Sequence, residues 1–479
     1  MNRKSRVWRS IFVLTLILCI TAAYTAPGRQ RDTQQGKIRA AIHMGREDDR
    51  QQDGRNGPGG DQPARAAEGE EAARREEEKA LDNALHARAA ALVDMESGRV
   101  LYEKNGSEML PMASTTKIMT CILALEEAGR DETVTASAYA AGQPKVHLGM
   151  QKGMSYEMDD LLHSLMLESH NDAAVAIAEH IGGKGMNLPD VAERSKEESR
   201  EAVKAFCDRM TEKAREIGCE NTRFLTPNGL DAEAESVDGE TIVHATTAAD
   251  LARMMCYCIN ESPQSGAFLE ITRAASHTFS DCEGKRTYAC NNHNAFLNMM
   301  DGALSGKTGF TNQAGYCYVG ALEQDGKKLA LALLACGWPN HKTWKWADSR
   351  QLFTYGLEHF ANCDFSPEVD LAPIPVAEGA AASGNPYEKT YIRPQRAGGV
   401  LPIRLMVRET ETVEACPEIQ TTLTAPVEAG TQIGTVSYYL TDECGKRQYL
   451  AAEAVYAEQG VAKIDFAFVF RFVRDRFLL

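Results

Sequence analysis

Metal-binding signatures and an excess of basic residues are both missing from the sequence. It has no Cys-x-x-Cys pair and no His-Glu-x-x-His segment, the patterns typical of structural and catalytic zinc sites. Its formal net charge of −15 argues against a nucleic-acid partner. The chain is therefore expected to hold no metal and to bind no nucleic acid. Its 479 residues are enough for about two to three domains.

Aromatic residues are absent from a long N-terminal stretch. From Pro27 to Leu101 there is no Phe, Trp or Tyr, and residues 30–79 are rich in Arg, Glu, Asp, Gln and Gly. Such a composition cannot bury enough apolar surface to offset the entropy that is lost on ordering. Residues 27–85 are therefore predicted to form a disordered, charged stalk, in which 72–87 could be a frayed helix. The stalk would be a spacer or simply a solvated tail.

The N-terminus has an apolar run that is too short for an ordinary transmembrane helix. Ile11–Ile20 follows four basic residues and precedes the small residues of 21–26. This order is typical of a secretory signal, so residues 1–26 are predicted to be a signal peptide and the chain is expected to be exported. An uncleaved membrane anchor is the alternative.

Cysteine is present in thirteen positions, of which twelve follow the signal. An exported protein can form disulfides, and Cys282 and Cys290 flank a probable hairpin where they could pair. Cys256 and Cys258 are two apart on a predicted helix, so they face different ways. Because the spacings form no tight framework, buried free thiols are the favoured interpretation.

Hydrophobic periodicity divides the rest of the chain into two domains and a tail. Strand-like segments over 89–106 and 314–337 enclose a series of helical segments, which predicts an α/β domain over residues 86–362. Its sheet should join the first and last segments and be mainly antiparallel. Short strands separated by turns predict a small all-β domain over residues 363–461.

A serine lies three residues before a lysine where a predicted helix begins. Ser114 and Lys117 in PMASTTKIMT (111–120) would share one helix face. The helix N-terminus would favour negative charge on the serine oxygen, and a partly buried lysine could accept the serine proton. The pair is weak evidence by itself, because one such spacing is expected by chance and a capping serine beside a solvated lysine explains it equally well.

Two further segments strengthen this interpretation. Ser169-His170-Asn171 lies between two apolar helices, and Lys307-Thr308-Gly309 precedes a predicted hairpin. Ser-x-x-Lys, Ser-x-Asn and Lys-Thr-Gly, in this order, are the triplet of penicillin-binding proteins and class A β-lactamases. A second Ser-x-Asn at 383–385 follows the Lys-Thr-Gly in a Pro/Gly/Ala-rich stretch, so we interpret it as a turn.

With these motifs, the sequence resembles a known family over residues 89–360. It is similar to the low-molecular-mass penicillin-binding proteins that are serine-type D-alanyl-D-alanine carboxypeptidases, peptidase family S11. The segments that carry the resemblance are LYEKN (101–105), LPMASTTKIMT (110–120), LMLESHNDAAVAIAEHIGG (165–183), NGL (228–230) and DGALSGKTGFTNQAGYCYVG (301–320). APVEAGTQIGTVSYYL (425–440) is similar to the family's C-terminal β domain. The resemblance implies the penicillin-binding-protein/β-lactamase fold, no cofactor, and an exported enzyme at the outer face of the cytoplasmic membrane or in the cell wall.

The resemblance also implies the substrate and the catalytic residues. Stem peptides ending in D-Ala-D-Ala would be the substrates, and β-lactams would be covalent inhibitors. Ser114 would attack the carbonyl of the penultimate D-Ala, Lys117 would be the general base and Ser169 would relay a proton. Water would then hydrolyse the acyl-enzyme.

The remaining motif residues would bind the substrate. By the resemblance, Asn171 positions it, Lys307 and Thr308 hold its terminal carboxylate, and Gly309 lets its backbone approach. The backbone N–H groups of Ser114 and Phe310 would form the oxyanion hole.

The sequence departs from the family at the second motif. The family usually has Gly at the position of His170 and often Pro at that of Glu168. A bulky His170 could narrow the cleft or slow turnover. The sequence leaves two alternative functions: a β-lactamase, for which no Glu-x-x-Leu-Asn segment is evident, and a non-catalytic peptidoglycan-binding protein, against which the intact Ser114 and Lys117 argue.

The last residues form a separate aromatic segment. Ile464–Leu479 carries five Phe and three Arg, a combination suited to a membrane interface. The resemblance points the same way, so 462–479 is predicted to be a membrane-associating tail. The alternation of Phe466 to Phe472 leaves open a last strand of the β domain.

Overall fold

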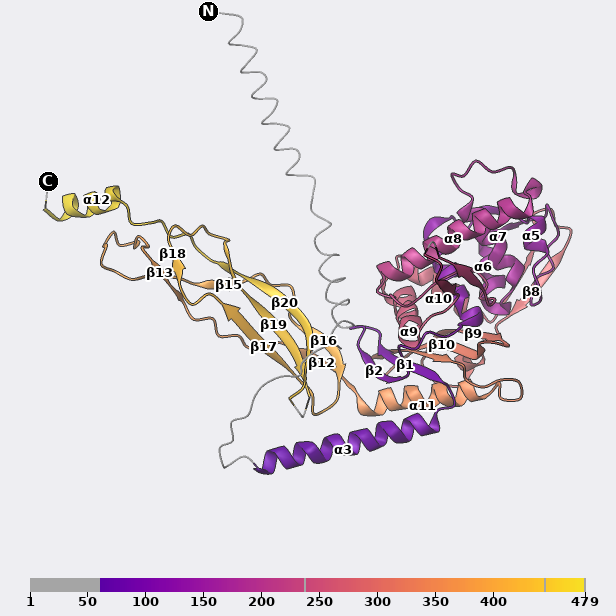
Figure 1. Cartoon of the computed structure of the whole chain (residues 1–479), viewed down its shortest axis with the longest axis horizontal. Coiled ribbons are helices and arrows are strands. Elements are labelled where there is room, and N and C mark those ends of the chain that lie inside the picture. The colour runs from indigo at the N-terminus through magenta and orange to yellow at the C-terminus, as the bar shows by residue number, and fades with distance from the viewer. Residues whose placement is uncertain (1–60, 237, 443–444, 478–479) are drawn as a thin grey trace, which may run out of the picture.

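The computed structural model describes residues 61–236, 238–442 and 445–477, which form an α/β domain and a narrow β domain (Figure 1). The β domain extends away from the α/β domain and carries the C-terminal helix α12 (Phe466–Phe477) at its far end (Figure 1). The predicted signal peptide 1–26 and the stalk as far as residue 60 lie outside the described residues.

A five-stranded sheet forms the centre of the α/β domain, in the order β2-β1-β11-β10-β9. Its strands are β1 (Ala89–Asp94), β2 (Val100–Lys104), β9 (Ala303–Thr311), β10 (Gly315–Gln324) and β11 (Lys327–Leu334). Every neighbouring pair is antiparallel, and Ala91 of β1 lies opposite Ala332 of β11. The first and last segments of the domain are therefore joined in one sheet, as the sequence predicts.

Both faces of this sheet are covered. Ala89, Ala91 and Val93 of β1 face a large core that is shared with most of the helices, whereas Ala90 and Leu92 face a second core under α11 (Trp344–His359). Alternate residues of a strand point to opposite faces, so the unbroken apolar sequence of β1 follows from burial on both sides. The helices of the larger core include α4 (Lys117–Glu127), α6 (Met158–His163), α7 (Asn171–Gly182), α8 (Lys196–Glu216), α9 (Ala248–Cys256) and α10 (Ser265–Arg273).

Short elements connect these helices. The helical ones are α5 (Ala138–Ala141), the 3-10 turns η1 (Ala113–Thr116), η3 (Val191–Glu193) and η5 (Ala295–Asn298), and the π-helical turns η2 (Ser164–Glu168) and η4 (Tyr257–Glu261). Three two-stranded ribbons pair β3 (Thr133–Thr135) with β4 (Ser155–Glu157), β5 (Glu233–Glu235) with β6 (Thr241–Val243), and β7 (Ser276–Ser280) with β8 (Thr287–Asn291).

The helix α3 (Asp61–Ala84) corrects the prediction that the whole of 27–85 is a disordered stalk. Leu81 and Leu85 near its end are buried in the core under α11, and Asp82 accepts a hydrogen bond from Tyr102. Glu77 forms an ion pair with His359 at the end of α11 (2.8 Å). A segment that is polar on average is thus ordered by a few apolar residues at its C-terminal end.

The C-terminal domain consists of strands around its own core. Its four-stranded sheet has the order β15-β20-β19-β17, and the buried residues Ile433, Val436 and Val455 belong to its core. The strands are β12 (Ala361–Phe365), β13 (Ile374–Ala377), β14 (Thr390–Ile392), β15 (Pro394–Arg396), β16 (Ile403–Val407), β17 (Thr412–Ile419), β18 (Leu423–Thr424), β19 (Gln432–Thr441) and β20 (Arg447–Ala457).

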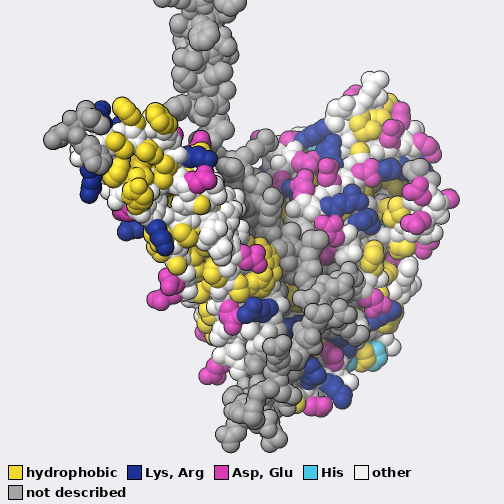
Figure 2. All heavy atoms as spheres, turned by 60° about the vertical axis from the view of Figure 1, so that its left-hand side comes forward, with side chains coloured by type: hydrophobic (Ala, Val, Ile, Leu, Met, Phe, Trp, Pro, Cys, Tyr) yellow, Lys and Arg dark blue, Asp and Glu magenta, His cyan; other side chains and the backbone are white. Residues whose placement is uncertain are grey.

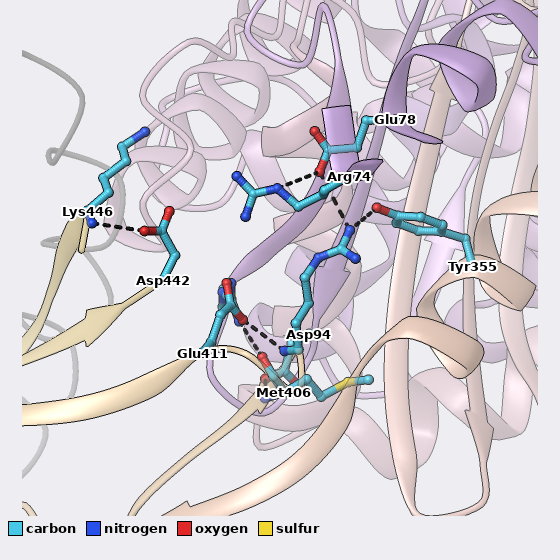
Figure 3. Close-up of polar contacts among 10 residues, drawn as sticks. Arg74, Glu78, Asp94, Tyr355, Met406, Glu411, Asp442 and Lys446 are labelled. Atoms are coloured by element: carbon cyan, nitrogen blue, oxygen red, sulfur yellow. Dashed lines mark hydrogen bonds and ion pairs between the residues drawn. The ribbon is translucent and has the colours of Figure 1, made fainter. Parts of the chain in front are cut away.

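A polar junction links the two domains (Figure 3). The guanidinium of Arg99, from the turn between β1 and β2, forms an ion pair with Glu411 and donates to the carbonyl of Met406 (2.6 Å). The Asp94 carboxylate accepts the N–H of Met406 (3.0 Å), and Arg408 lies against Tyr355 and Glu78. Because Arg99 and Glu411 are both almost buried, removing either partner would leave an uncompensated charge in the interface.

The tail is a helix, so its interpretation as a last strand is wrong. In α12 the side chains of Phe466 and Phe470 are 84% and 59% exposed. Within the described ranges no helix has both the length and the apolar character needed to cross a membrane.

The eleven described cysteines are free thiols, and eight of them are buried. Cys282 and Cys290, which could have paired, form no disulfide with each other. The preferred interpretation as small buried apolar side chains fits most of them.

Candidate active site

The first motif lies where η1 passes into α4. Ser114 belongs to η1 and Lys117 is the first residue of α4, so both stand at the start of one helical segment. The Lys117 Nζ lies 2.9 Å from the Ser114 Oγ. The structure thus brings together the two residues that the spacing predicts to face one another.

Lys117 is fully buried and has three polar neighbours. Besides Ser114, its Nζ contacts the Asn171 Oδ1 (2.9 Å) and the carbonyl oxygen of Asn228 (2.6 Å). Burial, with the charge of Lys307 nearby, holds the pKa of Lys117 well below its usual range. A neutral amine has two N–H groups and one lone pair. The two carbonyl oxygens can only accept, so the lone pair is left to face the Ser114 hydroxyl.

The second and third motifs meet in the same way. The Lys307 Nζ on β9 lies 3.0 Å from the Ser169 Oγ and donates to the Thr308 carbonyl (3.0 Å). Burial lowers the pKa of Lys307 to about 7. Ser169 follows the π-helix η2 in a left-handed conformation (φ 65°), and Asn171 begins α7. The site therefore contains two buried lysines, each beside a serine hydroxyl.

Strand β9 runs directly beside Ser114. A Cβ built on Gly309 would lie 2.8 Å from the backbone nitrogen of Ser114, so only glycine lets the strand approach this closely. Phe310 follows on the same strand, is 38% exposed and packs on the ring of Tyr316 (4.7 Å between centroids). Of the predicted site residues on β9, Gly309 is thus the one that lies against η1.

A loop that sequence reasoning did not assign to the site completes it. The carbonyl of Asn228 contacts the Nζ of Lys117, and a Cβ on Gly229 (φ +85°) would lie 1.9 Å from the carbonyl oxygen of Ala113. The only available signal was the segment Asn228–Leu230, which carried family resemblance without a role. An Asn-Gly step indicates a turn but not what its carbonyl contacts.

Behind η1, a buried histidine fixes the turn that carries Ser114. Burial and the nearby Lys117 lower the pKa of His244 to about 3, so the imidazole is neutral. Its Nδ1 accepts the N–H of Leu225 (3.0 Å), which leaves Nε2 to donate to the Thr116 Oγ1 (2.8 Å). The Thr116 hydroxyl in turn donates to the carbonyl of Ala113 (2.8 Å).

The residues before α7 are held by a neighbouring loop. Asn171 donates from its backbone to the carbonyl of Val146 (2.8 Å) and from its side chain to that of Pro144 (3.1 Å). The Asp172 carboxylate accepts the N–H groups of three successive residues, 148–150. Loop 144–150 therefore forms a wall of the site beside Asn171.

The other Ser-x-Asn segment lies far from these motifs in the fold. Ser383 and Asn385 belong to a loop of the β domain and, with α12, line a cavity of about 500 Å³. Ser383 donates to Glu388 within its own loop, and Gly384 has a positive φ of 78°. This segment is a turn, as its position in the sequence indicates.

Comparison with known proteins agrees with the motifs. The profile of the family described as D-alanyl-D-alanine carboxypeptidase, Peptidase S11, matches residues 74–191 and 197–336, more than half of the chain. The chain belongs to this family. The predicted resemblance is confirmed, and with it the fold class.

Individual curated relatives and solved structures are also similar to this chain. D-alanyl-D-alanine carboxypeptidase DacB2 of Mycobacterium tuberculosis is 29% identical over 270 residues, which are 56% of this chain and 80% of that protein. DacF of Bacillus subtilis, named as the same enzyme type, is 23% identical over 403 residues, 82% of this chain and 90% of that protein. Penicillin binding protein 5 from Haemophilus influenzae has the same fold (TM-score 0.57, 23% identity, 79% of this chain and 98% of that chain).

Proposed function

We propose that this S11 family member is a serine-type D-alanyl-D-alanine carboxypeptidase that removes the terminal D-Ala from stem pentapeptides through an acyl-enzyme on Ser114. The observation that carries the proposal is the position of the buried Lys117, whose Nζ lies 2.9 Å from the Ser114 Oγ. A neutral amine in this place is a general base that needs no histidine.

In the acylation step, Ser114 Oγ attacks the carbonyl carbon of the penultimate D-Ala while Lys117 accepts its proton. The tetrahedral oxyanion lies between the backbone N–H groups of Ser114 and Phe310. When the C–N bond breaks, the proton held by Lys117 passes through the Ser169 hydroxyl to the departing amine of D-Ala, so Lys117 is neutral again. Free D-Ala leaves with its own carboxylate intact.

Strand β9 supplies the residues that bind the terminal carboxylate of the substrate. Lys307 offers a cation and Thr308 a hydroxyl, and the close approach of Gly309 to η1 keeps the substrate backbone near the nucleophile. Asn171 holds Lys117 from one side and positions the substrate. In the deacylation step, water attacks the ester carbonyl and gives a proton to Lys117. Lys117 passes this proton to Ser114 Oγ as the ester C–O bond breaks, which releases the tetrapeptide and restores both residues.

The test is release of D-Ala from a stem pentapeptide, measured beside labelling by a fluorescent penicillin. The parent should do both and Ser114→Ala should do neither, although it folds normally. Rapid hydrolysis of the penicillin without D-Ala release would favour a β-lactamase. Labelling that persists in Ser114→Ala would contradict the proposed nucleophile. Cleavage of cross-linked peptides, but not of the pentapeptide, would favour an endopeptidase.

The proposal includes export and attachment to the outer face of the cytoplasmic membrane. The large apolar residues that the described part of α12 exposes are Phe466, Val469, Phe470 and Val473. Apolar side chains gather beside basic ones at the end of the β domain that carries α12, at the upper left of Figure 2. Such a helix can lie in a lipid interface with its rings inserted shallowly and its arginines near phosphates.

A further inference from the structure

The turn that carries the second motif is held in an unfavourable backbone conformation. Ser169 has φ 65° and ψ 33°, a left-handed conformation that costs energy for a residue with a Cβ. Surrounding contacts must hold such a residue in place. Its hydroxyl must also stay within reach of Lys307, 3.0 Å away.

The side chain of His170 supplies one of those contacts. Its Nδ1 lies 2.8 Å from the Oγ of Ser164, and both side chains are buried. Ser164 is the first residue of the π-helix η2, and its carbonyl accepts the N–H of Ser169. Ser164 therefore holds the turn at two points: its backbone carbonyl contacts Ser169 and its hydroxyl contacts His170.

We propose that His170 is a positioning residue, which holds Ser169 and Asn171 in their working orientation through its hydrogen bond to Ser164. A glycine at this position has no side chain to make that contact. The two neighbours of His170 in sequence are the residues that contact the buried lysines: Ser169 meets Lys307, and Asn171 meets Lys117 at 2.9 Å. The inference rests on the proposed carboxypeptidase function.

The charge of His170 is compatible with this position. Its pKa is lowered from the usual value, first by burial, while Asp172 and Glu168 oppose the shift and Lys117 and His147 add to it. A neutral imidazole adds no positive charge beside Lys117. It can accept from, or donate to, the Ser164 hydroxyl.

The test compares four variants by the rate of penicillin acylation and by the kcat and KM of D-Ala release. His170→Leu and Ser164→Ala should each slow acylation about tenfold, and the double variant should be no slower than the slower single one. His170→Asn places a polar atom near the position of Nδ1, so it should keep most of the rate. His170→Gly should be slow as well, because it removes the contact but not the strain at Ser169.

His163 provides a matched control. It is also buried and also lies on the segment before the turn, but it contacts the carbonyl of Asp159 instead. His163→Leu should leave acylation within about twofold of the parent, and thermal unfolding should show that all variants are folded.

Two kinds of result would overturn the inference. A His170→Gly enzyme as fast as the parent or faster would mean that the imidazole only narrows the cleft. Additive effects of His170→Leu and Ser164→Ala would mean that the two side chains act separately. If penicillin acylates the parent but the parent releases no D-Ala, the proposed carboxypeptidase function fails. The acylation rates of the variants then still test the positioning role of His170. If the parent is not acylated by penicillin and releases no D-Ala, both proposals fail.

Discussion

The carbonyl of Asn228 accepts a hydrogen bond of 2.6 Å from Lys117, across 111 residues of sequence. This contact and the one with the Asn171 Oδ1 use two positions around the buried amine, and the third contact of Nζ is the Ser114 Oγ. The orientation of the Lys117 amine is thus set by two segments that belong neither to its own helix nor to the strand that carries Lys307.

Gly229 should not tolerate a side chain. A Cβ there would lie 1.9 Å from the carbonyl oxygen of Ala113, so Gly229→Ala must displace either η1 or the Asn228 carbonyl. We expect penicillin acylation to slow by at least about tenfold. Gly218→Ala is the control, because Gly218 has the same φ of +85° but no atom within 4 Å of the added Cβ. Equal rates for the two variants would contradict this account of the loop.

The pH dependence of kcat/KM should reflect both buried lysines. Lys117 acts as a base only above its lowered pKa, so the rate should rise with pH on the acid side. Lys307 attracts the substrate carboxylate only while protonated, and burial lowers its pKa to about 7 in the free enzyme. The rate should therefore fall on the alkaline side at a pH below 10.5, the ordinary value for lysine. Lys307→Arg should move the alkaline fall upward, and an unchanged alkaline limb in that variant would rule out Lys307 as its source.

The two Ser-x-Asn segments should respond differently to the same substitution. Ser169→Ala removes a hydroxyl 3.0 Å from the Lys307 Nζ and should reduce acylation at least about tenfold. Ser383→Ala alters a loop of the β domain and should leave acylation unchanged. Time courses of fluorescent penicillin labelling measure both, and the reverse pattern would mean that the catalytic domain has been misidentified.

The junction between the domains should depend on its buried ion pair. Glu411→Ala would leave Arg99 buried and unpaired, and we expect a loss of about 3–5 kcal/mol in the free energy of unfolding. Arg404 and Asp364 form an exposed pair in the β domain, so Asp364→Ala should cost at most about 1 kcal/mol. Urea unfolding of the whole chain measures both. A similar small loss for the two variants would show that Arg99 finds another partner or water.

Removal of α12 should separate membrane binding from folding. Truncation after Asp465 keeps Lys463 and Ile464, which contact Glu378 of the β domain. The truncated chain should no longer sediment with anionic liposomes, while its penicillin labelling stays the same. Full-length protein that never sediments, or truncated protein that still does, would rule out α12 as the attachment.

Sequence reasoning found the three motifs because each is a short local pattern with a chemical meaning. It also predicted the antiparallel sheet, since apolar strands lay at both ends of the domain. It did not find the contact of Asn228 with Lys117 or of His244 with Thr116, because such contacts depend on the folded path of the chain. The helix α3 was predicted only in part, as a frayed helix over 72–87, because its average polarity concealed the buried Leu81 and Leu85 at its end.

Two of the buried thiols, Cys121 and Cys317, lie where their chemical modification would detect local opening of the fold. Cys121 is one turn beyond Lys117 in α4, and Cys317 lies opposite Gly309 in the sheet. Burial raises the pKa of both thiols, so little reactive thiolate forms in the closed structure. Modification of these two cysteines by an alkylating reagent requires that α4 or the β9–β10 ribbon first separates from its neighbours. The rate at which these native cysteines react therefore measures how often the structure beside the site opens, and no added probe is needed.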